Sequence, residues 1–169
     1  MSGKLAKDLT PDERFSFAVW GIWSTLWTWF QESEKMYGYD KAVELLRSVG
    51  RTQGIVGTQF YQEYFGFKPG EADQQTLINV SDHIHHIWGF ECPWTVVSPT
   101  VCYEEVKTCP VWDNIPADKR EEYVAKATCS NWCDSLLPEF YPKMGKVKAI
   151  RKASRPKGDP DCIFQLEAI

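Results

Sequence analysis

The strongest constraint on the fold is a change in sequence character at Pro93. Before it, apolar residues recur at the three- and four-residue spacing of amphipathic helices, whereas residues 94–107 are rich in Val, Thr and Tyr. Helices followed by strand, helix, strand and strand are typical of an α+β protein with an antiparallel sheet. We therefore expect a single domain over residues 1–169, with a helical part at about 10–91 and a mixed α/β part at about 92–169.

The helical part predicts three helices. Thr10-Pro11-Asp12-Glu13 combines an N-cap residue, a first-turn proline and a capping-box glutamate, so it indicates a strong helix start. A second helix is expected after the turn Gly38-Tyr39-Asp40, with Asp40 as its cap, and Lys68-Pro69-Gly70 should end it. The third helix is expected from about residue 72 to residue 90.

The second helix contains three glycines at near-helical spacing, Gly50, Gly54 and Gly57. Glycine lowers helix stability, so three of them on one face usually mean that another backbone or a ligand approaches closely. We interpret them as a close-packing surface.

Aromatic residues are concentrated in the first helix, where Trp20, Trp23 and Trp27 recur at helical spacing. Such a stripe usually faces a core. Indole rings also suit the wall of a small-molecule pocket, because each offers a flat apolar surface and one hydrogen-bond donor. The same rings could instead form part of a homodimer interface. Substrate binding by these tryptophans and a homodimer are therefore alternatives to simple core packing.

The C-terminal part predicts one or two strands within residues 94–107 and a fourth helix over about 114–137, which Pro138 and Pro142 should close. Another strand is expected to begin at Val147. In the last strand, alternate residues should point inward: Cys162, Phe164 and Leu166.

All three histidines lie in one short stretch, residues 82–92. Read as a helix, it places His83 and His86 one turn apart on the flank of an apolar face, with Asp82 within reach of His86. Histidine is the commonest metal ligand and titrates near neutral pH. The stretch therefore suits a zinc or iron site on His83 and His86, or an acid–base pair, or histidines that simply border a core face.

Charge and hydropathy exclude some partners. The formal net charge of -4 provides no long-range attraction for phosphate backbones, so we expect no nucleic-acid partner. The first residues contain no apolar targeting segment, and no apolar run reaches the length of a membrane span. A cytoplasmic protein without a membrane partner is expected, and its six cysteines should then be mostly thiols.

Cys129 and Cys133 are four residues apart, so both thiols should emerge on one face of the fourth helix. Adjacent thiols can bind soft metals, oxidise together or assist a nucleophile. Asp134 follows directly and could orient a reacting group. Phosphate loops, Gly-x-Ser-x-Gly motifs and dinucleotide fingerprints are absent from the sequence.

Three short motifs carry a resemblance to known families: Cys109-Pro110, Cys133-Asp134 and the ending Lys157-Gly158-Asp159-Pro160-Asp161-Cys162-Ile163-Phe164. Together they resemble the L-2-amino-thiazoline-4-carboxylate hydrolase family, over residues 95–169. The Gly-Asp-x-x-Cys-x-Phe ending also resembles the small-molecule-binding domains of the vinyl-reductase type.

The resemblance implies hydrolysis of a cyclic amidine, in which a thiazoline ring opens to an N-carbamoyl amino acid. Cys133 with Asp134 is the first candidate for nucleophile and partner, Cys109 the next, and His86 the candidate base. Arg151 is the candidate for holding a substrate carboxylate. In the alternative of a vinyl-reductase-type domain, the pocket holds a small molecule or metal without turnover and the cysteines sense redox state.

Overall fold

The computed structural model describes residues 8–122 and 128–169 and has the expected α+β architecture. The elements follow the order α1 (Pro11–Tyr37), α2 (Tyr39–Phe65), α3 (Gln74–Ile87), β1 (Trp94–Ser98), β2 (Val101–Val106), α4 (Pro110–Asp113), η2 (Ala117–Lys119), α6 (Thr128–Met144), β3 (Val147–Ala153), η3 (Arg155–Lys157) and β4 (Cys162–Ala168). The three long N-terminal helices and the four strands fall on the two sides of the change at Pro93, as predicted.

The four strands form one antiparallel sheet in the order β1-β2-β4-β3. Trp94 pairs with Glu104, Glu104 with Phe164, and Phe164 with Arg151. Residues directly opposite one another in a sheet project from the same face, so these four side chains form one row across all four strands.

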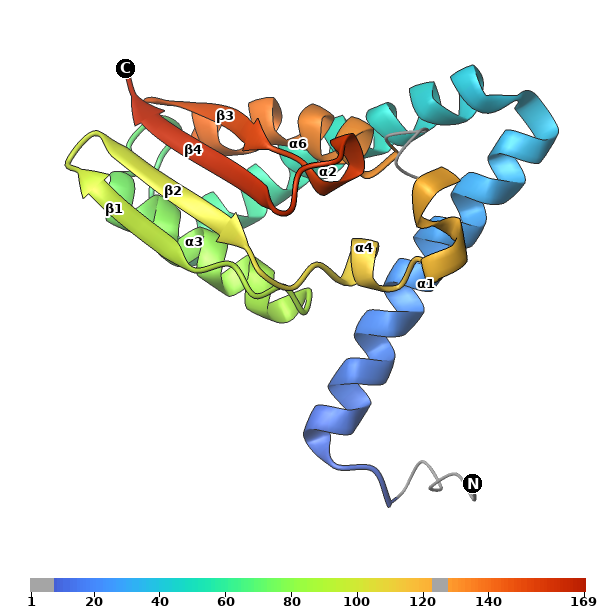
Figure 1. Ribbon diagram of the computed structural model, residues 1–169. Helices are drawn as coiled ribbons and strands as arrows, with labels where there is room; N and C mark the ends of the chain where they lie inside the picture. The colour runs from blue at the N-terminus through green and yellow to red at the C-terminus, as the bar shows by residue number, and fades with distance from the viewer. Residues whose placement is uncertain (1–7, 123–127) are drawn as a thin grey trace.

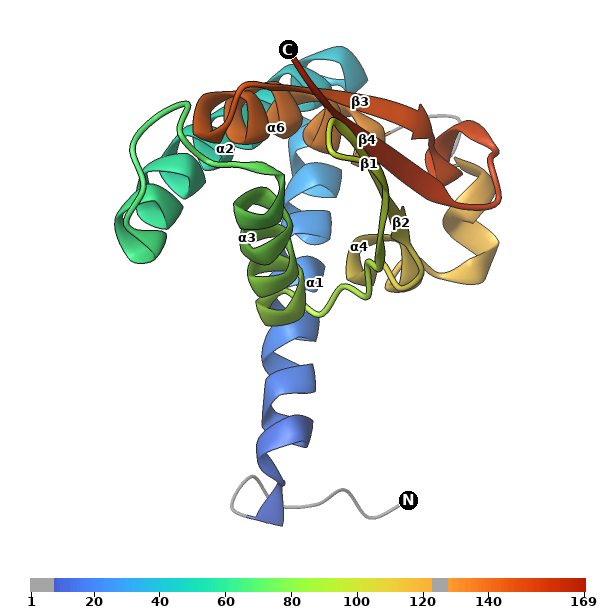
Figure 2. The same ribbon diagram turned by 90° about the vertical axis from the view of Figure 1, so that its left-hand side faces the viewer.

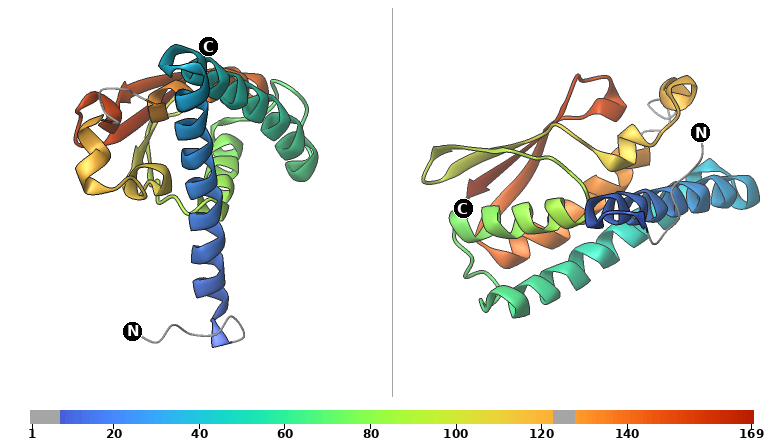
Figure 3. Two further views of the ribbon diagram at one scale, coloured as in Figure 1. Left: turned by 90° about the vertical axis from the view of Figure 1, so that its right-hand side faces the viewer. Right: turned by 90° about the horizontal axis from the view of Figure 1, so that it is seen from below.

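The helices cover one face of this sheet, as the view from below shows (Figure 3). Helix α6 packs on β3, and α2 packs against α6. Helix α3 lies beside α6 under the other edge of the sheet (Figure 2). The row containing Glu104 and Arg151 therefore lies between the sheet and the helices.

Helix α1 begins as predicted, outside the body of the protein, and runs into it (Figure 1). The Thr10 hydroxyl accepts a hydrogen bond from the Glu13 N–H at 3.2 Å, and the Glu13 carboxylate accepts from the Thr10 N–H at 2.8 Å, which completes the capping box. The N-terminal part of α1 extends away from the other elements (Figure 1), and Phe17 and Trp20 on it are exposed. The homodimer suggested by this aromatic surface stays a prediction.

The glycines of α2 pack closely against α6, as predicted. A Cβ on Gly50 would lie 2.6 Å from the carbonyl oxygen of Trp132, and a Cβ on Gly54 would lie 2.7 Å from the Glu139 Cβ. Both distances are too short for a side chain. The hydroxyl of Thr58 also donates to the carbonyl oxygen of Glu139 at 2.9 Å, which adds a polar contact between the two helices.

Several helix boundaries differ from the sequence prediction. Helix α2 ends at Phe65, with Gly66 as its C-cap, before the Lys68-Pro69-Gly70 segment that was expected to end it, and α3 is shorter than predicted at both ends.

Asp40 does not cap α2: the N-cap is Gly38, whose φ of 81° lets the chain turn sharply between α1 and α2. Pro138 and Pro142 do not close α6, because both lie inside it and the helix continues to Met144. Packing against α2 and β3 holds α6 together although each proline removes one backbone donor.

The start of the predicted fourth helix is also different. Residues 110–113 form the single turn α4, and residues 117–119 form a short 3-10 turn before residue 120. Residues 123–127 of the prediction lie outside the described residues.

Two groups of buried side chains form the core. One lies between the sheet, α3 and α6 and includes Leu77, Phe140 and Met144; the other lies between α1, α2 and α6 and includes Trp23 and Phe30. All six cysteines are free thiols, as the sequence predicted. Over the described ranges, no helix is both long enough and apolar enough to cross a lipid bilayer.

Candidate ligand-binding cavity

A cavity of about 600 Å³ lies between the inner face of the sheet and helices α2, α3 and α6. Most of its wall is aromatic or aliphatic. Aromatic side chains from five separate segments of the chain line the cavity, among them Phe60, Trp88, Trp112, Trp132, Phe140 and Phe164. A volume of this size and a wall of this composition are typical of small-molecule sites in proteins.

Arg151 on β3 is the only arginine or lysine among the described residues of the wall. Its guanidinium carbon lies 4.5 Å from the centre of the Phe164 ring, and its Nε donates to the Asp134 carboxylate on α6. Its side chain is only 10% exposed, and its Nη2 is buried without a hydrogen-bond partner in the described structure. One edge of the guanidinium is thus available to a molecule in the cavity.

The surroundings of Arg151 keep it charged. Burial by itself lowers the pKa of the guanidinium, but the neighbouring Cys133 and Asp134 outweigh burial and raise the pKa above its ordinary value. The cavity therefore contains a fixed positive charge among apolar side chains, which favours an anionic group in the ligand.

Two predicted nucleophiles, Cys109 and Cys133, also line the cavity. Burial raises the pKa of the Cys109 thiol to about 12. Burial also raises the pKa of Cys133, although Arg151 partly lowers it. Since only the thiolate is a good nucleophile, both groups are weakly reactive at neutral pH in this form of the protein. Cys109 additionally caps α4, because its sulfur accepts a hydrogen bond from the Trp112 N–H at 3.4 Å.

Other predicted site residues lie outside the wall. Asp134 pairs with Arg151 and, at 3.7 Å, with Lys157. Trp20 is 57% exposed on α1, whereas Trp23 is buried one layer behind the cavity, where its ring contacts wall residues. Trp20, Trp23 and Trp27 do not line the cavity. The indole rings in its wall belong to Trp88, Trp112 and Trp132.

The histidines point in three directions from α3. His86 is exposed and stacks on Phe15, with 6.3 Å between the ring centres. His83 lies among Tyr61, Tyr64 and Phe65, and its Nδ1 is buried without a hydrogen-bond partner in the described structure. The structure therefore does not place His83 and His86 in one ligand set, and neither residue lines the cavity.

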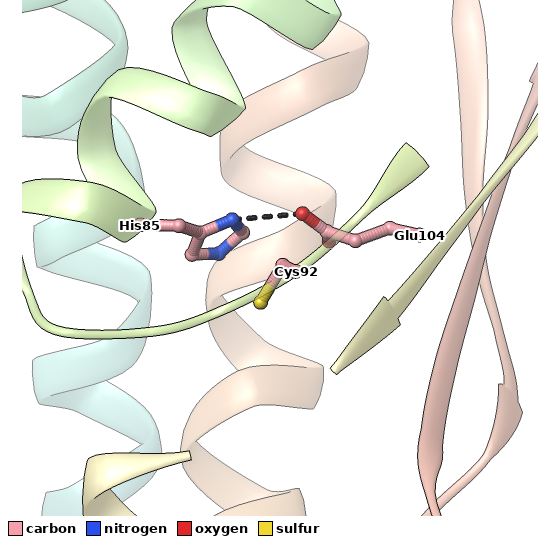
Figure 4. Close-up of side chains that lie close together, drawn as sticks. All are labelled: His85, Cys92 and Glu104. Atoms are coloured by element: carbon pink, nitrogen blue, oxygen red, sulfur yellow. Dashed lines mark ion pairs between the residues drawn. The ribbon is translucent and has the colours of Figure 1, made fainter. Parts of the chain in front are cut away.

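His85, for which the sequence predicts no role, is the histidine that faces the cavity. Its Nδ1 lies 2.7 Å from Glu104 Oε1 and 3.0 Å from Ser81 Oγ (Figure 4). Ser81 donates to Glu104 Oε1 at 2.7 Å and accepts from the Tyr141 hydroxyl at 2.9 Å. The result is a continuous hydrogen-bonded network at the end of the cavity nearest β2.

Comparison with known proteins supports only the fold. No protein-family model matches the chain, and no curated protein matches its sequence. Among solved structures, a trafficking protein particle complex subunit 3 from Naegleria fowleri, covalently bound to palmitic acid, superimposes with a TM-score of 0.55 at 13% sequence identity. The match covers 90% of this chain and 95% of that one, so the two proteins share an architecture over nearly their whole length.

Proposed function

We propose that this protein binds a small, largely apolar molecule that carries one anionic group, such as a medium-chain or aromatic carboxylate. The apolar part occupies the cavity and the anion contacts Arg151. The observation that carries the proposal is the unpaired, buried Nη2 of Arg151 in the wall of an otherwise apolar cavity of about 600 Å³.

The energetics favour this class of ligand. A buried donor without a partner costs about 1–3 kcal/mol, and a carboxylate that accepts from it removes that cost. Arginine is well suited to this role, because its planar guanidinium can donate two parallel hydrogen bonds to a carboxylate. The structural neighbour is covalently bound to palmitic acid, so a protein of this architecture can hold a hydrocarbon chain.

The test compares two ligands that differ only in charge, decanoate and decanol, by isothermal titration calorimetry. We expect decanoate to bind about 10- to 100-fold more tightly, since a hydrogen bond to a charged group contributes about 1.5–3 kcal/mol. In Arg151→Met this preference should disappear while the affinity for decanol changes little. Arg47→Met is the matched control, because Arg47 is on the exposed side of α2 and contacts Asn131 rather than the cavity.

Equal binding of decanoate and decanol to the wild-type protein would refute the role of Arg151. If neither compound nor an aromatic carboxylate such as naphthoate bound at millimolar concentration, the cavity would not be a site for this class of molecule.

Hydrolysis of a cyclic amidine is the second candidate, and the position of Cys133 beside Arg151 favours it. In that reaction water adds to the amidine carbon of a thiazoline carboxylate, the ring C–S bond breaks, the sulfur leaves as a thiol, and an N-carbamoyl amino acid is released. Arg151 would hold the carboxylate and Cys133 or Cys109 would assist at the amidine carbon.

Release of thiol from 2-amino-thiazoline-4-carboxylate, followed with a thiol reagent, tests this candidate. Catalysis requires turnover by the wild-type protein and its loss in Cys133→Ala or in Cys109→Ala. Absence of turnover, or full turnover in both Cys133→Ala and Cys109→Ala, would remove this candidate and leave the binding proposal as it stands.

A further inference from the structure

We infer that His85, Cys92 and Glu104 form a binding site for a divalent metal ion of the zinc type. The three residues come from α3, from the segment that precedes β1, and from β2. One ligand atom from each lies within 4.8 Å of the other two, and in the described part of the chain this is the only such group of three or more potential ligands. Figure 4 shows the three side chains close together, with the His85 ring facing the Glu104 carboxylate and Cys92 below them.

The donor set suits zinc. Imidazole nitrogen, thiolate sulfur and carboxylate oxygen are the three kinds of ligand that zinc sites use, and mixed sets with sulfur and nitrogen discriminate against magnesium and calcium. The nearest thiols outside the group serve other purposes: Cys109 caps α4 and Cys162 accepts a hydrogen bond from the Arg155 N–H.

The spacing needs only a small adjustment. In a tetrahedral zinc site, bond lengths of about 2.0–2.3 Å place ligand atoms roughly 3.3–3.8 Å apart. Here the ligand atoms lie within 4.8 Å of one another, and His85 Nδ1 is 2.7 Å from Glu104 Oε1, which is a hydrogen-bond distance. Side-chain rotations that move the ligand atoms by about 1 Å would replace this hydrogen bond with one bond from His85 and one bond from Glu104 to the ion.

The surroundings of Glu104 give an independent reason for a cation. This residue is 1% exposed, and its only basic partner among the described residues is His85, at 2.7 Å, which carries a charge only when protonated. A buried carboxylate is costly unless it is paired or coordinates a metal. Ser81 donates to it and Tyr141 donates to Ser81, the arrangement by which outer hydrogen bonds orient metal-binding carboxylates.

The site would leave one coordination position unfilled by protein. Zinc sites with three protein ligands keep a fourth position for water or substrate, unlike closed structural sites. Since His85 and Glu104 both line the cavity, that position would face it. The metal site and Arg151 then lie on either side of Phe164, because Phe164 pairs with both Glu104 and Arg151.

The test is titration of the full-length, chelator-treated protein with Co²⁺ and Zn²⁺, followed by absorption spectroscopy and elemental analysis. We expect one ion per chain, a thiolate-to-cobalt charge-transfer band, and displacement of Co²⁺ by Zn²⁺. Cys92→Ser should abolish the band, and Glu104→Gln and His85→Gln should each weaken zinc binding at least tenfold.

Two matched controls separate this site from nonspecific binding. Cys102→Ala removes a thiol that is equally buried and lies two residues from Glu104 on β2, and His86→Gln removes the exposed histidine next to His85. Both should retain one ion per chain and an unchanged spectrum.

A wild-type protein that binds less than about one ion per chain, or a Co²⁺ spectrum without a thiolate band, would overturn the inference. So would an unchanged band in Cys92→Ser. If Cys92→Ser or Glu104→Gln failed to fold by circular dichroism, the wild-type cobalt spectrum together with His85→Gln, whose side chain is 22% exposed and tolerates change, decides the question. No step requires a cavity ligand, so the result is independent of the decanoate experiment.

Discussion

Replacement of Gly54 by alanine tests whether close backbone contact sets the spacing of α2 and α6. A Cβ at this position would lie 2.7 Å from the Cβ of Glu139 and 2.8 Å from the carbonyl oxygen of Leu136. Neither atom is at the flexible end of a side chain, so neither can rotate away. The two helices would have to move apart, next to the cavity that both of them line.

The expected loss follows from two opposing contributions. Alanine in a helix interior is about 1 kcal/mol more favourable than glycine, which stabilises the variant. Overpacking of a close contact costs about 1–3 kcal/mol, and two contacts this short place Gly54→Ala at the upper end. The net decrease in the free energy of unfolding should be about 2 kcal/mol, or roughly 4–8 °C in Tm for a chain of this size.

Gly21→Ala is the matched control, because nothing lies within 4 Å of a Cβ at Gly21 on α1. It should gain up to about 1 kcal/mol, with a rise of about 2–4 °C. Gly57→Ala should fall between the two, since the nearest atom, at 3.2 Å, belongs to the Phe140 ring and that ring can shift. Thermal and urea unfolding followed by circular dichroism measure all three. A Gly54→Ala variant as stable as the wild type would refute the packing argument.

Two further expectations concern ionisable groups. Asp73 caps α3, and hydrogen bonds from Thr76, first its side chain and then its backbone, lower the Asp73 pKa. Asp73→Ala should cost about 1 kcal/mol at pH 7. Because only the ionised Asp73 carboxylate stabilises the fold, the stability difference between wild type and Asp73→Ala should vanish as the pH falls below about 4 and through the lowered pKa. Urea unfolding at pH 7 and at pH 2 measures this difference. An equal difference at the two pH values would contradict the prediction. With a pKa of about 12, Cys109 should react slowly with iodoacetamide at pH 7, and the reaction should become about tenfold faster for each pH unit up to pH 10. Peptide mass spectrometry measures the rate of this reaction. A rate that is flat above pH 7 would contradict burial of the neutral thiol.

Features determined by neighbours in the sequence were predictable. The capping box at Thr10 needs only residues within three positions of one another, and it is present. The inward alternation of Cys162, Phe164 and Leu166 follows from the two-residue period of a strand, and all three are buried. The three glycines of α2 also indicated a close contact, although the sequence did not say that α6 is the partner.

Apolar spacing predicted the buried face of α3 only in part. Leu77 and Val80 are fully buried and Ile84 packs against the core, but Ser81, a polar residue, is completely buried as well. Residues four apart share a helix face, so Ser81 brings His85 inward and leaves His86 outside. Apolar spacing gives no information on a buried serine, so it could not show that His85, rather than His83 or His86, lies beside Glu104.

Glu104 is a candidate site residue that the strand pattern alone could have indicated. It lies between Cys102 and Val106 in a strand with strict alternation, and both neighbours are buried. A carboxylate at an inward position of such a strand indicates a functional or paired group. Its partners could not be inferred, because His85 and Cys92 reach it only through tertiary packing of α3 and β2. The cavity likewise combines Cys109, Cys133 and Arg151, which the sequence did suggest, with tryptophans that it did not.

The cavity is shared by both parts of the chain, so a ligand of the proposed class would stabilise both of them at once. A molecule that binds only the folded state stabilises it by about 2.7 kcal/mol when present at 100 times its Kd. The wall of the cavity is made by α2 and α3 from the N-terminal part and by α6 and the sheet from the C-terminal part. A bound ligand would therefore oppose the separation of the two parts from each other. Since cells degrade proteins according to the fraction that is unfolded, the proposed function implies that the amount of this protein rises and falls with the concentration of the proposed ligand.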